Sequence, residues 1–75
     1  MVHAFVMVDV AAGTAERVVE GVRVLDHVEE AHVVAGEHDV IAEVDAPDVQ
    51  AVLALASDVR ALDGVTDTRT YVAMD

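Results

Sequence analysis

The chain has 75 residues and a strongly acidic composition: 15 Asp and Glu, four Lys and Arg in total, and a formal net charge of −11. A surface of this charge repels phosphate backbones, so direct DNA or RNA binding is disfavoured. The absence of cysteine excludes disulfides and thiolate metal sites. No apolar run is long enough to span a bilayer, and we expect a cytoplasmic protein.

Hydrophobic residues make up 55% of the chain, which excludes a disordered acidic tail because disorder goes with low hydrophobicity. A folded domain with this many carboxylates suits high salt, where repulsion between them is screened. The lack of lysine therefore indicates a halophilic cytoplasm, with an ordinary acidic protein as the alternative. A chain this short buries only about 60% of its unfolded surface, so we expect oligomerisation to add stability.

The first half of the chain predicts a strand, a helix and a second strand. Residues 3–10 are rich in β-formers and apolar on both faces, with Phe5 and Met7 on one face and valines on the other. Thr14 is a plausible N-cap for an amphipathic helix that runs to about Leu25. The core stripe of this helix consists of Ala15, Val18, Val19, Val22 and Leu25, and residues 28–34 follow as a strand.

The second half repeats this order after a hairpin turn at Gly36–Asp39 and a strand over residues 40–44. Pro47 suits the first position of the second helix and Asp48 its first turn, while Gly64 is expected to end it. Residues 65–73 read as a strand with clean alternation. The predicted apolar stripe of the helix consists of Val49, Val52, Leu53, Ala56, Val59 and Leu62.

The two halves resemble each other in sequence. Residues 22–28 align with residues 59–65 at an offset of 37, with five identities. Two βαβ units in tandem predict an α+β ferredoxin-like plait, βαββαβ, with a four-stranded antiparallel sheet of order 4-1-3-2 and both helices on one face. The uncovered face would be apolar along both central strands, which predicts a face-to-face homodimer and a larger ring of dimers.

Side chains able to perform catalysis or hold a metal are few. The four His residues show no spacing that makes three ligands converge, so we expect no metal site. No nucleophilic triad or phosphate loop is present, and we expect neither catalytic residues nor a cofactor. Asp9 and Glu43 lie in the central strands, where a structural ion pair, with Arg69 as candidate partner, is favoured over a catalytic role.

A zwitterionic ligand is the chemistry that the remaining polar residues fit. Asp39 would accept hydrogen bonds from an ammonium group, while backbone N–H groups around Gly36 and a Thr hydroxyl would donate to a carboxylate. The hydroxyls of Thr66, Thr68 and Thr70 would meet the turn of a neighbouring subunit. The alternative interpretation of these threonines is simple β-propensity on an edge strand.

Several segments together resemble the RAM domain, the effector-binding and oligomerisation domain of Lrp/AsnC-type transcription regulators, in a haloarchaeal-like version. They are the first strand Ala4–Val8, the Gly-x-x-Asp hairpin within Val33–Val40, the Leu62–Val65 segment and the Thr68-Arg69-Thr70 strand. The resemblance implies dimers that assemble into octamers and bind an amino-acid effector between dimers. Carried over by position, the effector residues are Gly36, His38, Asp39, Thr68 and Thr70.

The resemblance also implies how such a protein would act. We expect residues 1–75 to form a single RAM-like domain without a DNA-binding helix-turn-helix. It would modulate transcription through partners, including full-length Lrp/AsnC regulators, without touching DNA. The alternatives are a small cofactor-free enzyme of the dimeric α+β barrel type, a purely structural oligomerisation module, and an ACT-like amino-acid domain, which differs mainly in how subunits pair.

Overall fold

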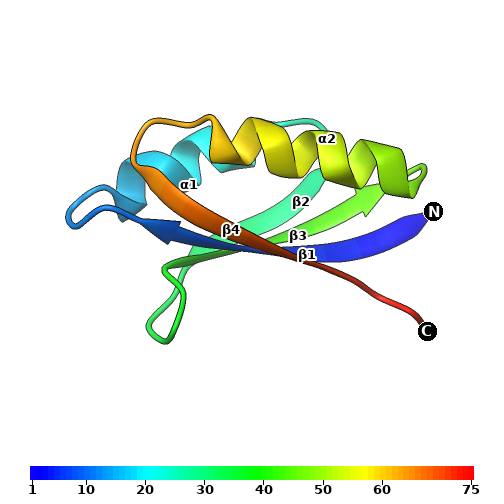
Figure 1. Ribbon diagram of the computed structural model, residues 1–75, viewed down its shortest axis with the longest axis horizontal. Helices are drawn as coiled ribbons and strands as arrows, with labels where there is room; N and C mark the ends of the chain where they lie inside the picture. The colour runs from blue at the N-terminus through cyan, green and yellow to red at the C-terminus, as the bar shows by residue number, and fades with distance from the viewer.

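A four-stranded antiparallel sheet with two helices on one face makes up the computed structural model, which describes residues 1–75 (Figure 1). The strand order β2-β3-β1-β4 confirms the predicted ferredoxin-like plait. None of its helices could cross a membrane. The elements are β1 (Val2–Val10), α1 (Ala15–Arg23), β2 (Val28–Val33), β3 (Val40–Ala46), α2 (Val49–Arg60) and β4 (Val65–Val72).

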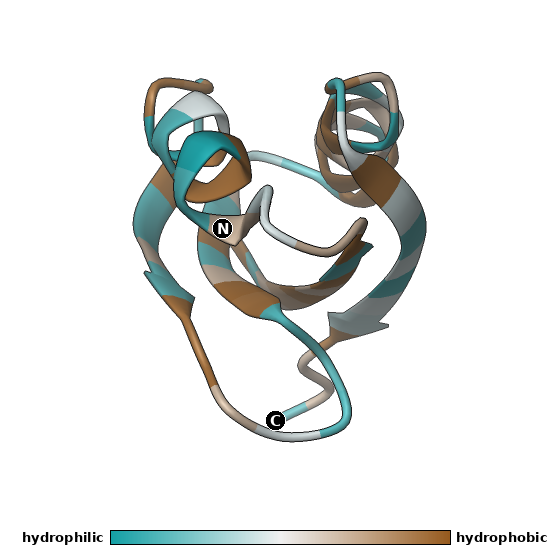
Figure 2. Ribbon diagram, turned by 90° about the vertical axis from the view of Figure 1, so that its left-hand side faces the viewer, coloured by the Kyte–Doolittle hydropathy of each residue, from teal (hydrophilic) through white to brown (hydrophobic).

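The core lies between the helices and the sheet. All 14 buried residues are hydrophobic, and no polar or charged residue is buried. Along β1 and β3 every second residue is buried, because side chains alternate between the two faces of a strand. Figure 2 shows both helices above the sheet and the hairpin between β2 and β3 below it.

The predicted apolar stripe of α1 is confirmed at its centre, where Val18, Val19 and Val22 are buried. Thr14 does precede the helix, but its hydroxyl makes no cap. It donates instead to the carbonyl of Ala11 at 2.7 Å. The helix ends at Arg23, slightly before the expected boundary.

The start and the buried side of α2 differ from the prediction. Asp48 is the N-cap, and its carboxylate accepts from the N–H of Ala51 at 2.8 Å, so Pro47 lies outside the helix. The buried residues are Val52, Leu55 and Val59, whereas Leu53 is 55% exposed. Because α2 carries apolar residues on several sides, the sheet beneath it decides which of them are buried.

The turn after each helix follows the same path in the two halves. Leu25 N–H donates to Val22 O, and Leu62 N–H donates to Val59 O, both at 3.1 Å. His27 then has φ 74° and Gly64 has φ 98°. The prediction that Gly64 ends α2 is therefore wrong. The helix ends at Arg60, and Gly64 turns the chain into β4.

The expected clean alternation of β4 is wrong at its start. Asp9 pairs with Asp67, but Val10 pairs with Val65, so Thr66 is an extra residue in a β-bulge. Val65 consequently shares the helix-covered side with Val10 and packs against the core. The alternation holds beyond the bulge.

The side of the sheet that no helix covers, called here the open face, carries the remaining strand residues. Phe5 and Met7 of β1 lie on it, half-buried, as predicted. Of β3, only Ile41 adds an apolar side chain, because Glu43 and Asp45 occupy its next positions. The expectation that both central strands are apolar on both faces therefore holds for β1 and only in part for β3.

Candidate functional site

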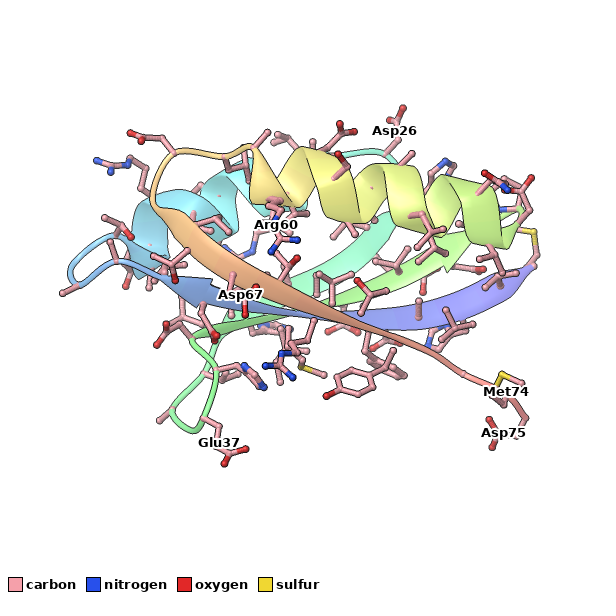
Figure 3. All side chains as sticks on the ribbon, viewed as in Figure 1. Asp26, Glu37, Arg60, Asp67, Met74 and Asp75 are labelled. Carbon is pink, nitrogen blue, oxygen red and sulfur yellow. The ribbon has the colours of Figure 1, made fainter.

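The hairpin between β2 and β3 projects from the sheet on the side away from the helices, with Glu37 near its tip (Figure 3). Asp39 makes three hydrogen bonds, two that attach the hairpin to the end of β1 and one that closes the hairpin itself. Its N–H donates to Val8 O at 3.0 Å, and its carbonyl accepts from Val34 N–H at 2.9 Å. Its carboxylate Oδ2 accepts from Val10 N–H at 2.9 Å.

The imidazole of His38 is held by Asp9. Nδ1 of His38 lies 2.9 Å from Oδ1 of Asp9, and both side chains are partly buried, with 26% and 32% of their surface exposed. A carboxylate partner requires a proton on Nδ1, which leaves Nε2 free. Nε2 accepts a hydrogen bond when the ring is neutral and donates one when the ring is protonated.

Gly36 sits in the hairpin without a conformational need for glycine. Its φ lies outside the left-handed region, and a Cβ built on it would meet no atom within 4 Å. The hairpin of a single chain would therefore accept a side chain at this position. The space beside Gly36 is open for a ligand or a neighbouring chain.

Thr68 and Thr70 lie on the other side of the sheet from the projecting hairpin. They pair with Val8 and Val6, whose side chains are buried beneath the helices. Directly opposite residues of an antiparallel pair share a face, so both threonines belong to the helix-covered side. One chain thus brings together Gly36, His38 and Asp39 but does not bring the two threonines to them.

The carboxylates of the central strands have histidine partners rather than Arg69. Glu43 Oε2 lies 3.1 Å from His3 Nε2, and Asp9 is bound to His38. Arg69 lies 4.0 Å from Asp67 on its own strand. The structural ion pair was expected, but its partner was wrong, because the hairpin brings His38 to Asp9, β1 brings His3 to Glu43, and Arg69 lies nearest Asp67.

Three potential metal ligands also converge, which the sequence spacing did not indicate. Ligand atoms of His3, Glu29 and Glu43 lie within 4.8 Å of one another. They come from three strands, and β2 has an irregular register between Val28 and Glu30 that includes Glu29. A nitrogen and two carboxylates are a ligand set that a divalent cation accepts. No spacing along the chain reveals such a set, since each ligand belongs to a different strand.

One cavity, of about 400 Å³, was not expected from the sequence. It lies between the turn that follows α1 and one side of α2 over residues 51–58, and it includes none of the predicted effector residues. Its lining residues are Val24, Leu25, Asp26, His27, Ala51, Ala54, Leu55 and Asp58.

Comparison with known families and solved structures identifies proteins similar to this chain. The profile of the Lrp/AsnC ligand binding domain matches residues 3–75. Protein TTHA0845 from Thermus thermophilus is 28% identical with a TM-score of 0.95, covering 100% of this chain and 95% of that chain. Hypothetical protein PHS023 from Pyrococcus horikoshii is 31% identical with a TM-score of 0.88, covering 99% and 90%.

A third similar structure is the transcriptional regulator NMB0573 from Neisseria meningitidis in complex with L-Met. It is 22% identical with a TM-score of 0.83, and the match covers 99% of this chain and 50% of that chain. At this identity the similarity concerns the fold alone. No curated protein matches the chain. The family profile matches nearly the whole chain, and the chain has the βαββαβ plait. The chain therefore belongs to the Lrp/AsnC ligand-binding domain family.

Proposed function

We propose that this chain is an amino-acid-responsive regulatory module that binds its effector at the β2–β3 hairpin, between subunits of an assembly. The observation that carries the proposal is the anchored hairpin, with His38 and Asp39 fixed to the end of β1 and Gly36 open to its surroundings. Membership of a ligand-binding family and the L-Met complex of a regulator with this fold support an α-amino acid as the ligand.

The free atoms of the hairpin fit the two ends of a zwitterion. Oδ2 of Asp39 is occupied by Val10, but its Oδ1 has no hydrogen-bond partner in the chain and can accept from an ammonium group. Nε2 of His38 is also free, and the backbone near Gly36 is accessible. Thr68 and Thr70 would have to come from a neighbouring subunit, since they lie on the other side of their own sheet.

The open face supports assembly as the second half of the proposal. Phe5, Met7 and Ile41 form an apolar centre there, and an uncovered apolar centre on a sheet is typical of an interface. We propose a face-to-face homodimer, further association into a ring such as an octamer, and mixed assembly with full-length Lrp/AsnC regulators. With a net charge of −11, the module would act on transcription in a salt-rich cytoplasm through these partners rather than on DNA.

No observation favours an enzyme. The space between the helices and the sheet is filled by valine, alanine and leucine side chains, and no polar group is buried there. A catalytic site beneath the helices, as the α+β barrel alternative requires, would need both room and polar groups.

Calorimetric titration with each of the twenty amino acids in molar KCl tests the effector claim. We expect at least one amino acid to bind, and Asp39→Asn to weaken that binding about 10-fold or more, because a hydrogen bond to a charged group contributes about 1.5–3 kcal/mol. Asn keeps an oxygen for Val10 N–H, so the hairpin should stay anchored.

Glu37→Gln is the matched control for this titration. Glu37 is an exposed carboxylate at the tip of the same hairpin, and its loss should leave the affinity unchanged. Absence of binding by every amino acid, or an equal effect of the two variants, would contradict the proposed site. The mass of the assembly is a separate measurement and would be unaffected by that outcome.

A further inference from the structure

The cavity between the end of α1 and α2 combines an apolar floor with two carboxylates. Leu25, Ala51 and Leu55 contribute apolar surface, and Asp26 and Asp58 contribute the charges. Neither carboxylate has an ion-pair partner within the chain, whereas several other acidic residues do. Figure 3 shows the side chain of Asp26 directed outward from the helical layer.

The internal repeat gives every residue of this cavity a counterpart in the other half. The offset of 37 that relates the two halves also relates α1 to the last nine residues of α2, and both helices end at an arginine. The counterparts belong to the turn after α2 and to residues 14–21, which include most of α1. The pairs are Val24 and Ala61, Leu25 and Leu62, Asp26 and Asp63, His27 and Gly64, Ala51 and Thr14, Ala54 and Arg17, Leu55 and Val18, and Asp58 and Gly21.

The counterpart of the cavity is closed by side chains of the chain itself. A Cβ on Gly21 would lie 3.4 Å from Leu62, so that leucine fills the space beside the helix. Gly64 lies so close to Thr14 that an added Cβ would be 2.9 Å from its hydroxyl. On the same turn, Asp63 has a carboxylate oxygen 3.9 Å from a guanidinium nitrogen of Arg17.

The cavity has a counterpart of the Asp63 carboxylate but no counterpart of the Arg17 guanidinium. Asp26 stands where Asp63 stands in the other half, but Ala54 stands where Arg17 does. Asp58 replaces Gly21 and adds a second carboxylate. The Arg17–Asp63 pair is 68% and 99% exposed, so it contributes little to stability, but it marks where a guanidinium fits against such a turn.

We propose that this cavity binds the guanidinium of an arginine side chain from a partner polypeptide. The aliphatic stem of the arginine would lie on Ala51, Ala54 and Leu55, and its guanidinium would meet Asp26 and Asp58 in the manner that Arg17 meets Asp63. The site is separate from the hairpin and does not rest on the effector proposal.

A polypeptide source is favoured over a free small molecule by two features. Val24 at the rim is 80% exposed, which offers apolar contact to residues that flank the arginine. The chain carries a net charge of −11, so a basic protein segment would be drawn to it over a distance.

Amide-resolved NMR titration, in the lowest KCl concentration at which the chain stays folded, tests the proposal. The probes are acetyl-Ala-Arg-Ala-amide, the same peptide with citrulline, and n-butylguanidine. Citrulline matches arginine in shape but is neutral. We expect the arginine peptide to shift the amides of Asp26, Ala51 and Asp58, and the citrulline peptide to bind at least tenfold more weakly.

Variants separate the cavity from general attraction to an acidic surface. Asp26→Asn and Asp58→Asn should each weaken binding of the arginine peptide threefold or more. Ala54→Arg should abolish that binding, because the new side chain would supply the guanidinium from within the chain. Asp63→Asn is the matched control, because Asp63 is the counterpart that already has Arg17. It should leave the affinity unchanged.

Three results would overturn the proposal. Equal binding of the arginine and citrulline peptides would show that charge is not recognised. An equal loss of affinity for the arginine peptide in Asp63→Asn and Asp26→Asn would show only a general attraction of the peptide to the acidic surface. Binding of n-butylguanidine as tight as that of the peptide would assign the cavity to a free small molecule instead of a partner polypeptide. Ala54 is exposed on its helix, so the arginine variant is expected to fold.

Discussion

His27 and Gly64 occupy the same place in the two halves but bring different backbone preferences to it. Both have positive φ, at 74° and 98°. The left-handed region costs an L-residue roughly 1–2 kcal/mol, while glycine enters it without a steric penalty. His27 is therefore the one non-glycine residue held in this region, and its carbonyl, which accepts from Asp45 N–H at 3.0 Å, helps to hold the turn.

Replacing His27 with glycine should stabilise the fold. The relieved backbone strain exceeds the entropy that glycine adds to the unfolded chain, so we expect a gain of about 0.5–1 kcal/mol. Chemical denaturation at constant KCl measures the change. Gly64→Ala is the counterpart and should destabilise by about 1 kcal/mol or more, because φ is unfavourable and the new Cβ would press on Thr14. A loss of stability in His27→Gly would contradict the strain argument.

At the scale of elements, the two helices begin differently although their halves repeat. Asp48 caps α2 through its carboxylate, whereas the hydroxyl of Thr14 turns back to Ala11 and leaves α1 without a side-chain cap. Ser, Thr, Asp and Asn all suit an N-cap, so composition alone does not distinguish the two cases. The loop before each helix decides where the capping oxygen points.

Asp48→Ala should destabilise the domain by about 1 kcal/mol, because the N–H of Ala51 loses its partner in the first turn of α2. Asp48→Asn retains a capping oxygen and should have a much smaller effect. Thermal unfolding of the three proteins at the same salt concentration gives the comparison. Equal destabilisation by alanine and asparagine would assign the effect to charge instead of the cap.

At the scale of the whole molecule, the helices cover one face of the sheet and leave Phe5, Met7 and Ile41 half-buried on the other. A chain of 75 residues has little surface to bury on its own, and pairing through the open face would bury more. The mixture of apolar centre and flanking charges on this face suits an interface between folded subunits.

Met7→Glu should prevent the proposed face-to-face dimer and give monomers, because a carboxylate would be placed in the apolar centre of the open face. Analytical ultracentrifugation in molar KCl measures the molar mass. Leu53→Glu is the matched control: Leu53 is 55% exposed on α2, away from the open face, and its replacement should leave the mass unchanged. A monomeric native protein, or equal masses of Met7→Glu and the native chain, would contradict the interface.

The order of strands and helices, the buried stripe of α1 and the hairpin at Gly36–Asp39 followed from the sequence by itself. These features depend on local periodicity and on turn residues, which neighbouring positions in the chain specify. The internal repeat was also visible, and it predicted the pairing of βαβ units. The sequence placed Asp39 in a turn, but it did not predict that Asp39 lies beside the end of β1 or that it makes three hydrogen bonds.

The tertiary structure alone decided the features that depend on contacts between distant segments. It decided that Leu55, instead of Leu53, faces the sheet, and that a bulge at Thr66 moves Val65 onto the core. It brought His38 to Asp9 across 29 positions of sequence and placed Thr68 beneath the helices. It also left a cavity beside Ala54 where the other half holds Arg17, because a cavity arises from how a turn and a helix that are distant in sequence are placed, and not from the periodicity of the helix.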